Sequence, residues 1–293
     1  MKYFVMDIGG TFMKYALMDE EGKLLSSDKV KTPKKYLAEF FETLDAIIVE
    51  DIQGIALSFP GPVMADTGKV LECGSMNYMS GVHLTNEITQ RYHIPCTLEN
   101  DAHCAALAEV WQGNLQGVSV GMVMVFGTGI GSSLAINGSI YKGAHNFSGE
   151  ISCMITKDID TLGWNARFSF EAGIPYLLDR VKKAKQIVED FSGEELFALL
   201  DQKDRVTEEI FHLYCKDLAK QIYNFEVMMD PARICIGGGV SMQPRFISSI
   251  QKALDEFYAK IPMDVPMPEL MPCKFHNDSN LIGALYHFKL LTQ

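Results

Sequence analysis

Four short segments of this chain have residue types and spacings that could do chemistry. Three are glycine-rich and one is acidic: 7–11 (DIGGT), 126–133 (FGTGIGSS), 236–240 (IGGGV) and 99–101 (END). Each glycine segment follows an apolar run typical of a strand, so each is predicted to be a loop at a strand end. Because glycine lets the main chain approach a ligand closely, N–H groups in such loops can surround phosphate oxygens. The pattern predicts an ATP-dependent phosphotransferase.

The predicted ATP-binding residues lie in the three glycine segments. Asp7 is the candidate ligand for Mg²⁺, through water, because this ion prefers carboxylates and keeps much of its hydration. Taken alone, Asp7 could be a turn carboxylate and the glycines of 237–239 a simple turn. The predicted set is Asp7, Gly9, Gly10, Thr11, Gly127, Thr128, Gly129, Gly237, Gly238 and Gly239. The G-x-x-x-x-G-K-[ST] pattern of Walker-type proteins does not occur in the chain.

Asp101 is the candidate general base of such a reaction. It follows the strand-like residues 96–99 and precedes a predicted helix over 102–111, so its carboxylate lies where the helix dipole favours the charged form. A carboxylate there could accept the proton of an acceptor hydroxyl during phosphoryl transfer. An Asp at a helix start is also a common N-cap, and without the neighbouring motifs that structural role is the more frequent one.

The elements that must position these segments alternate between strands and helices. A hairpin meander is predicted over 3–30, and a second hairpin over 122–136 turns through the second glycine loop. Helical periodicity predicts helices near 36–50 and 207–229. The recurrence of strand, glycine loop and strand after about 120 residues predicts two similar α/β halves that face each other, with the nucleotide in the cleft between them.

The length of the chain favours two domains, because 293 residues exceed the usual size of a single core. The N-terminal α/β domain is predicted to span 1–115 and to be completed by a closing helix over 279–293. The C-terminal α/β domain is predicted to span 116–278. Within it, a capping box at 192–195 predicts a helix start, and the Pro- and Met-rich stretch 261–272 is predicted to be irregular.

The composition limits the classes of partner and the compartment. A net charge of -11 argues against nucleic acid or an anionic membrane as the main partner, because either would need a basic face. The sequence has no run of 18 apolar residues, and its start lacks the pattern of a secretory signal, so we expect a cytoplasmic protein. Its seven cysteines form no C-x-C or C-x-x-C pair, which predicts reduced thiols and no zinc site.

Taken in order, the motifs resemble those of the ROK family of bacterial sugar kinases and repressors. The matching stretches, which span nearly the whole chain, are 7–11, 58–63 (SFPGPV), 99–102 (ENDA), 127–131 and 237–239. The resemblance implies the actin-like, ribonuclease H-like ATPase fold, in which two similar α/β domains flank a cleft. It also implies ATP and Mg²⁺ as cofactors, a small-molecule sugar as the second substrate, and a homodimer.

The resemblance further implies which residues hold the sugar. By position in the family's motifs, Asn100 and Glu150 match residues that bind sugar hydroxyls, and Asp101 matches the catalytic base. Glu171 matches a further sugar ligand, although it could equally be a surface Glu at a helix start. Asn77 is expected to lie near the sugar as well.

The chain departs from the family's pattern between residues 149 and 171. Cys153 stands where the family has a histidine that touches both sugar and zinc, and 156–171 contains no cysteine where the family has its zinc loop. The departure implies that this chain has no zinc site. In this altered stretch and in the tail 280–288, the sequence is similar to the β-glucoside kinases of the family. Those enzymes phosphorylate the 6-hydroxyl of the non-reducing glucose in cellobiose and related glucosides.

The motifs are compatible with other activities as well. A glucokinase or an N-acetylmannosamine kinase would share the same motifs. A sugar-sensing repressor of the family would carry a helix-turn-helix ahead of the first glycine segment, whereas here Asp7 lies almost at the start of an acidic chain. A catalytically silent actin-like protein would not need both phosphate loops and Asp101. The identity of the sugar depends on pocket walls that the sequence does not position.

Overall fold

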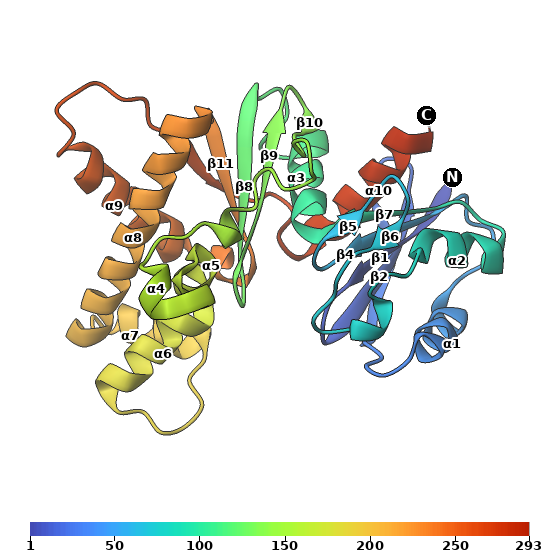
Figure 1. Cartoon of the computed structure of the whole chain (residues 1–293), viewed down its shortest axis with the longest axis horizontal. Coiled ribbons are helices and arrows are strands. Elements are labelled where there is room, and N and C mark those ends of the chain that lie inside the picture. The colour runs from blue at the N-terminus through green and yellow to red at the C-terminus, as the bar shows by residue number, and fades with distance from the viewer. Residues whose placement is uncertain (293) are drawn as a thin grey trace. The chain divides into compact units, whose positions relative to one another are not determined.

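The computed structural model describes residues 1–292, and the contacts within it divide the chain into two units (Figure 1). Unit 1 contains residues 1–113 and the C-terminal segment from Asp278, and unit 2 contains residues 114–277. Each unit is built on one five-stranded mixed sheet with helices packed against it.

The sheet of unit 1 has the strand order β3-β2-β1-β4-β7. Its strands are β1 (Lys2–Ile8), β2 (Phe12–Asp19), β3 (Leu24–Lys31), β4 (Ile55–Phe59) and β7 (Cys96–Asn100). The first three form an antiparallel meander, whereas β1, β4 and β7 are parallel. Parallel strands bring their carboxyl ends to one edge of a sheet, which is where sites of α/β proteins form. A separate short hairpin joins β5 (Val63–Met64) to β6 (Lys69–Val70).

The helices of unit 1 are α1 (Leu37–Ile47), α2 (Leu84–Tyr92), α3 (Asp101–Gln112) and α10 (Ser279–Thr292). The core between helices and sheet contains Phe4, Met6 and Phe59, all buried. Helices α3 and α10 pack closely, because a Cβ on Gly283 would overlap the carbonyl of Cys104. The last helix of the chain therefore completes the unit that the first strand begins.

The sheet of unit 2 has the order β10-β9-β8-β11-β12. Its strands are β8 (Val120–Phe126), β9 (Ile130–Ile136), β10 (Ser139–Ile140), β11 (Arg233–Gly237) and β12 (Glu269–Pro272). Again three strands are antiparallel and the last two continue in parallel. The repeat of one topology confirms the prediction of two similar α/β halves. The stretch 261–272 is not irregular throughout as predicted, because its last four residues pair with β11.

The helices of unit 2 are α4 (Ile159–Leu162), α5 (Phe168–Ala172), α6 (Ile174–Lys185), α7 (Gly193–Asp201), α8 (Arg205–Met229) and α9 (Pro244–Tyr258). Helices α8 and α9 lie side by side (Figure 1), and buried residues such as Tyr214 and Phe246 join them to the core. The capping box predicted at 192–195 is present, since the Ser192 hydroxyl accepts from Glu195 N and the Glu195 carboxylate accepts from Ser192 N.

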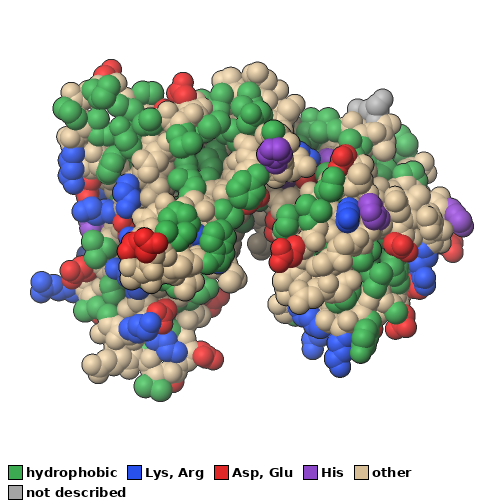
Figure 2. Space-filling model, in the orientation of Figure 1, with side chains coloured by type: hydrophobic (Ala, Val, Ile, Leu, Met, Phe, Trp, Pro, Cys, Tyr) green, Lys and Arg blue, Asp and Glu red, His purple; other side chains and the backbone are tan. Residues whose placement is uncertain are grey.

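The surface carries charges of both signs. On the face shown in Figure 2, lysine and arginine side chains form small clusters next to acidic ones rather than one large basic patch. No helix in residues 1–292 has the length and apolar composition that crossing a membrane requires.

Candidate active site

The first glycine loop is the turn between β1 and β2. The N–H of Gly9 donates to the carbonyl of Phe12 at 3.0 Å, and a Cβ on Gly9 would lie only 2.8 Å from that oxygen. Thr32 fixes the loop from outside, with its hydroxyl on Gly9 O at 2.6 Å and its N–H on Thr11 O at 3.0 Å. Within residues 1–292 the N–H groups of Gly10 and Thr11 have no acceptor, so they remain available to an anion.

Asp7 is the last residue but one of β1, and only Ile8 separates it from this loop. Ser58 Oγ and Asn280 Nδ2 both donate to its Oδ1, at 2.8 and 3.0 Å. Burial raises the pKa of Asp7, while the hydrogen bonds from Asn280 and Ser58 and the charge of Lys14 oppose that rise. A buried carboxylate whose charged form is disfavoured gains from a nearby cation, so Asp7 fits the expected role at a hydrated Mg²⁺.

Asp101 is the first residue of α3. The N-cap is its neighbour Asn100, whose Oδ1 accepts from the N–H groups of Ala102 and His103 at 2.9 and 3.1 Å. Asp101 Oδ1 also accepts from Ala102 N at 2.8 Å, so both side chains contact the first turn, while Asn100 is the residue that caps the helix. The Asp101 carboxylate lies in the first turn, where the helix dipole stabilises a negative charge.

Asp7 and Asp101 lie at the same edge of the sheet. In the parallel register Asp7 is opposite Ser58, and Ser58 is opposite Glu99, so these three residues form one row across β1, β4 and β7. Asp101 lies two residues after Glu99 in the sequence, at the start of α3. Because adjacent strands are about 4.8 Å apart, the backbone at Asp7 and the backbone at Glu99 are separated across the sheet by roughly 10 Å.

Asn100 and Asn77 differ in what they can offer a sugar. Asn100 uses its oxygen in the helix cap and one amide hydrogen on Gly61 O at 3.0 Å. A second amide hydrogen remains. Asn77 is exposed and begins the short helix Asn77–Met79, in the loop whose Ser75 lies beside Gly10.

A buried carboxylate lies behind Asp101. Glu99 Oε1 accepts from Asn100 N at 2.9 Å and contacts His103 Nδ1 at 3.0 Å, and His287 Nδ1 lies 3.6 Å from the other oxygen. All three side chains are buried. No sequence spacing could have predicted this cluster, because His287 comes from the last helix.

The second glycine loop connects β8 to β9 in unit 2. The N–H of Gly127 donates to Gly129 O at 2.9 Å, and Ile174 N, in the first turn of α6, donates to Gly127 O at 3.0 Å. A Cβ on Gly129 would overlap Ser169 Oγ. As in the first loop, two N–H groups, those of Thr128 and Gly129, have no acceptor within residues 1–292.

The glycine triplet 237–239 packs against the strand that leads into this loop. Gly238 has φ +87°, and a Cβ there would overlap the carbonyl of Phe126. Gly237 ends β11, whereas Gly239 begins a short helix, and its Cβ would meet nothing within 4 Å. The structure thus brings together the two glycine motifs that the sequence places about 110 residues apart.

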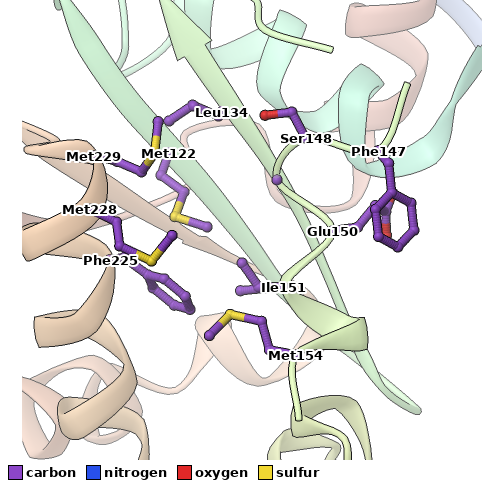
Figure 3. A pocket seen from close by; sticks show the side chains of 11 residues that line it. Met122, Leu134, Phe147, Ser148, Glu150, Ile151, Met154, Phe225, Met228 and Met229 are labelled. Carbon is purple, nitrogen blue, oxygen red and sulfur yellow. The ribbon is translucent and has the colours of Figure 1, made fainter. Parts of the chain in front are cut away.

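Glu150 lies on a segment that Ser132 holds in place. The Ser132 hydroxyl donates to Gly149 O and accepts from Ile151 N at 3.3 Å. The Glu150 carboxylate accepts from Ser152 Oγ at 3.3 Å. In Figure 3 its side chain extends toward Phe147, whereas Ile151 points to the other side of the segment, into a cavity of about 200 Å³ lined by methionines.

Glu171 is 9% exposed, so it is not an ordinary surface residue. Thr156 Oγ1 donates to its Oε1 at 2.6 Å, and Lys157 Nζ lies 3.2 Å from its Oε2. The N–H groups of Thr156 and Lys157 both donate to Ala166 O. These contacts hold in place the segment that stands where the family has its zinc loop. In residues 1–292, no three His, Cys, Asp or Glu side chains are grouped so that they could bind a metal ion.

Comparison with known proteins extends over the whole chain. A family model described as the ROK family matches residues 3–174 and 175–290. The chain is 27% identical to a β-glucoside kinase of Listeria monocytogenes, over 98% of this chain and 97% of that one. It is 28% identical to a β-glucoside kinase of Klebsiella pneumoniae, over 99% and 97% of the two chains.

Solved structures share the fold. A ROK family protein from Streptococcus pneumoniae, determined in complex with sucrose, has a TM-score of 0.90 and 28% identity, with 99% of each chain covered. A glucokinase from Streptomyces griseus, determined with glucose and AMPPNP, has a TM-score of 0.83 over 97% of this chain and 98% of that one. Its identity of 20% supports a likeness of fold alone.

Proposed function

The chain belongs to the ROK family, and from this premise we propose that it is an ATP-dependent sugar kinase. It would transfer the γ-phosphoryl group of ATP to a sugar hydroxyl. The observation that carries the proposal is the row of residues at the edge of the unit 1 sheet, where Asp101 starts a helix two residues beyond the register of Asp7. The names of the curated relatives, β-glucoside kinase among them, support the same class of reaction.

In this proposal Asp101 is the general base. The sugar hydroxyl oxygen forms a bond to the γ-phosphorus, the bond from that phosphorus to the β–γ bridging oxygen breaks, and the hydroxyl proton passes to the Asp101 carboxylate. The helix dipole favours the charged form of this carboxylate, which is the form that can accept the proton. The Asn100 cap holds the first turn of α3, so the base does not have to be ordered during the reaction.

Backbone amides would hold the phosphates. The N–H groups of Gly10 and Thr11 in unit 1, and of Thr128 and Gly129 in unit 2, have no acceptor within residues 1–292. Fixed dipoles of this kind stabilise the charge of the transferring group without reorganisation. Gly237, Gly238 and Gly239 would contact the adenosine.

Asp7 would hold Mg²⁺, through water, with Ser58 and Asn280 keeping its carboxylate in place. When bound, this ion neutralises charge on the β- and γ-phosphate oxygens.

We propose that the acceptor is the 6-hydroxyl of the glucose unit of a β-glucoside such as cellobiose. The sugar ligands would be Asn77, Asn100, Glu150 and Glu171, and Asp101 would contact the reacting hydroxyl. The support is that relatives covering nearly the whole chain are named β-glucoside kinases and that a solved relative holds a disaccharide. Glucokinase and N-acetylmannosamine kinase remain as alternatives, since one curated relative is named a glucokinase and the description of a solved structure from Listeria monocytogenes, 27% identical, suggests an N-acetylmannosamine kinase.

An ATP-coupled assay with a panel of acceptors tests both levels of the proposal. The panel contains glucose, cellobiose, gentiobiose, aryl β-glucosides, N-acetylmannosamine, allose and fructose, with Asp101→Asn as the inactive control. We expect the highest kcat/KM with the β-glucosides. Much faster phosphorylation of free glucose or N-acetylmannosamine would refute the substrate, and no phosphorylation of any sugar would leave a non-catalytic regulator.

The assembly and the compartment are also proposed. We expect a homodimer in the cytoplasm, acting on a small-molecule sugar and ATP, with neither nucleic acid nor membrane as a partner. Light scattering after gel filtration would give twice the monomer mass, and a monomeric mass at micromolar concentration would refute the dimer.

A further inference from the structure

A second cavity of unit 2 lies against the second glycine loop. Its volume is about 410 Å³, and its wall includes Thr128 and Gly129 of the loop, Arg167, and Tyr176 and Asp179 of α6. This cavity lies within a single unit, and the backbone of the glycine loop forms part of its lining. Outside the loop, none of the residues predicted for the site lines this cavity. Arg167 is not among the predicted site residues either.

The structure holds Arg167 firmly at the cavity wall. Its backbone forms a β-bridge with Ile155, and the following residue, Phe168, donates its N–H to Met154 O at 2.7 Å. Its Nη1 donates to Trp164 O at 2.7 Å, and its guanidinium carbon lies 5.1 Å from the centre of the Trp164 ring. A guanidinium held by a carbonyl and an aromatic ring loses little further freedom when it binds a ligand.

Most of the hydrogen-bonding capacity of Arg167 is unused. A guanidinium has five N–H donors, and in residues 1–292 the bond to Trp164 O is the only hydrogen bond that this one makes. The adjoining loop offers the N–H groups of Thr128 and Gly129, which also lack an acceptor there. Donors from a fixed cation and from a glycine loop, facing one cavity, suit the oxygens of a phosphate chain.

The acidic residue of the cavity does not oppose an anion strongly. Asp179 forms an ion pair with Lys183 Nζ at 2.6 Å, one turn further along α6. Arg180 adds a second cation near the wall, with its guanidinium carbon 5.8 Å from the centre of the Tyr176 ring. Among the residues that line the cavity together with the loop, Arg167 is the cation.

We infer that Arg167 binds the phosphate chain of ATP and positions it on the second glycine loop. The inference rests on the proposed kinase function and adds a side chain to a phosphate site otherwise made of backbone amides. The chemistry favours the β- and γ-phosphates, because they carry most of the negative charge that a guanidinium recognises. Arg167 is thus a nucleotide-binding residue that no motif of the sequence indicated.

Binding of ATP in the presence of Mg²⁺, measured by calorimetry without any sugar, tests this role. Charge-assisted hydrogen bonds of this kind contribute enough that Arg167→Gln should raise the Kd for ATP roughly ten- to a hundredfold. Arg167→Lys should recover part of the affinity, because it keeps the charge and loses the planar fork. The matched control is Arg180→Gln, which removes a cation near the same wall and should leave the Kd for ATP within roughly twofold. AMP, which lacks the β- and γ-phosphates, should bind all three variants alike.

An equal Kd for ATP in Arg167→Gln and Arg180→Gln would overturn the inference. If Arg167→Gln does not fold, labelling of the wild-type protein with phenylglyoxal decides the question. ATP should protect Arg167 but not Arg180 in the modified peptides, and equal labelling of Arg167 with and without ATP would overturn the inference. Failure of the kinase proposal looks different, because wild-type protein would then bind ATP with Arg167 protected and phosphorylate no sugar.

Discussion

Each unit contains a hairpin that turns through a glycine loop, but the residues beside the two loops differ in chemical type. In each, the first strand ends at an apolar residue, Ile8 or Phe126, and the loop follows. The preceding residue is Asp7 in unit 1 and Val125 in unit 2. One hairpin therefore carries a carboxylate where the other carries an aliphatic side chain.

The contacts that hold the two loops in place also differ. The loop of unit 1 follows a carboxylate that receives hydrogen bonds from Ser58 and Asn280. The loop of unit 2 has no such carboxylate, and it is held by backbone hydrogen bonds and by close packing of Gly129 on Ser169 and of Gly238 on Phe126. One fold occurs twice, with the charged groups that we propose for catalysis in unit 1 and a closely packed glycine loop in unit 2. Three substitutions test this division, and a fourth tests a buried carboxyl group of unit 2 that lies outside both loops.

Asp101→Asn should have the largest effect. The amide cannot accept the hydroxyl proton, so kcat should fall by roughly 10²- to 10⁴-fold, while KM for the sugar changes little. Because Asn100 supplies the helix cap, the thermal unfolding temperature should be close to that of the wild type. A variant that keeps more than a tenth of the wild-type kcat would remove Asp101 from the role of base.

Asp7→Asn should be the next most damaging change. Removing the charge should weaken Mg²⁺ binding, so the Mg²⁺ concentration for half-maximal activity should rise and kcat should fall roughly a hundredfold. Val125→Ala at the corresponding position of unit 2 is the matched control, and it should leave the Mg²⁺ dependence unchanged. Identical Mg²⁺ titrations for Asp7→Asn and wild type would contradict the assignment of charge to unit 1.

Gly238→Ala should act through structure. At φ +87° an alanine is strained, and its Cβ would overlap the Phe126 carbonyl, so we expect a loss of about 3 kcal/mol in the free energy of unfolding. Gly239→Ala is the control, because a Cβ there meets nothing within 4 Å. Urea unfolding measures both. Equal stability of the two variants would show that the packing of this triplet on β8 is not what requires glycine.

Glu226→Gln should give the smallest effect, and one of opposite sign. Glu226 is 4% exposed, and burial together with neighbouring Asp230 raises its pKa from 4.5 to about 7. With a raised pKa in the folded state, its contribution to stability is fully present below pH 4.5 and is lost as the pH rises through about 7.

The neutral amide removes that loss. Glu226→Gln should therefore be more stable than wild type by about 2 kcal/mol at pH 8, and the two proteins should converge below pH 4.5. Urea unfolding at a series of pH values checks the slope. A wild-type protein whose stability is flat between pH 4.5 and 8 would contradict the raised pKa.

The sequence was sufficient for features that depend on neighbouring residues. The glycine loops, the start of α3 at Asp101 and the repeated hairpin are all local patterns, and the predicted family and fold class are confirmed. The sugar-kinase assignment agrees with the names of the curated relatives. The roles of individual site residues stay predictions.

Features that depend on distant residues could not be predicted. Asn280 reaches Asp7 across 273 positions, and His287 reaches Glu99 from the last helix. Glu171 has no local signal of burial, because Lys157 and Thr156 become its partners only when the preceding loop folds back. Strand β12 was missed because its four residues, which include Pro272, are too few to show strand periodicity, and only pairing with β11 makes it a strand.

The close packing of Gly283 on Cys104 has a consequence for the nascent chain. Unit 2 is one uninterrupted stretch, so a ribosome has made all of it while unit 1 still lacks α10. The helix that bears Asp101 therefore lacks its packing partner until residues 279–292 have been made. Asp7 likewise waits for Asn280 of the same helix, so unit 1 would be completed only after unit 2 has been made, and deletion of α10 would damage the unit that is made first.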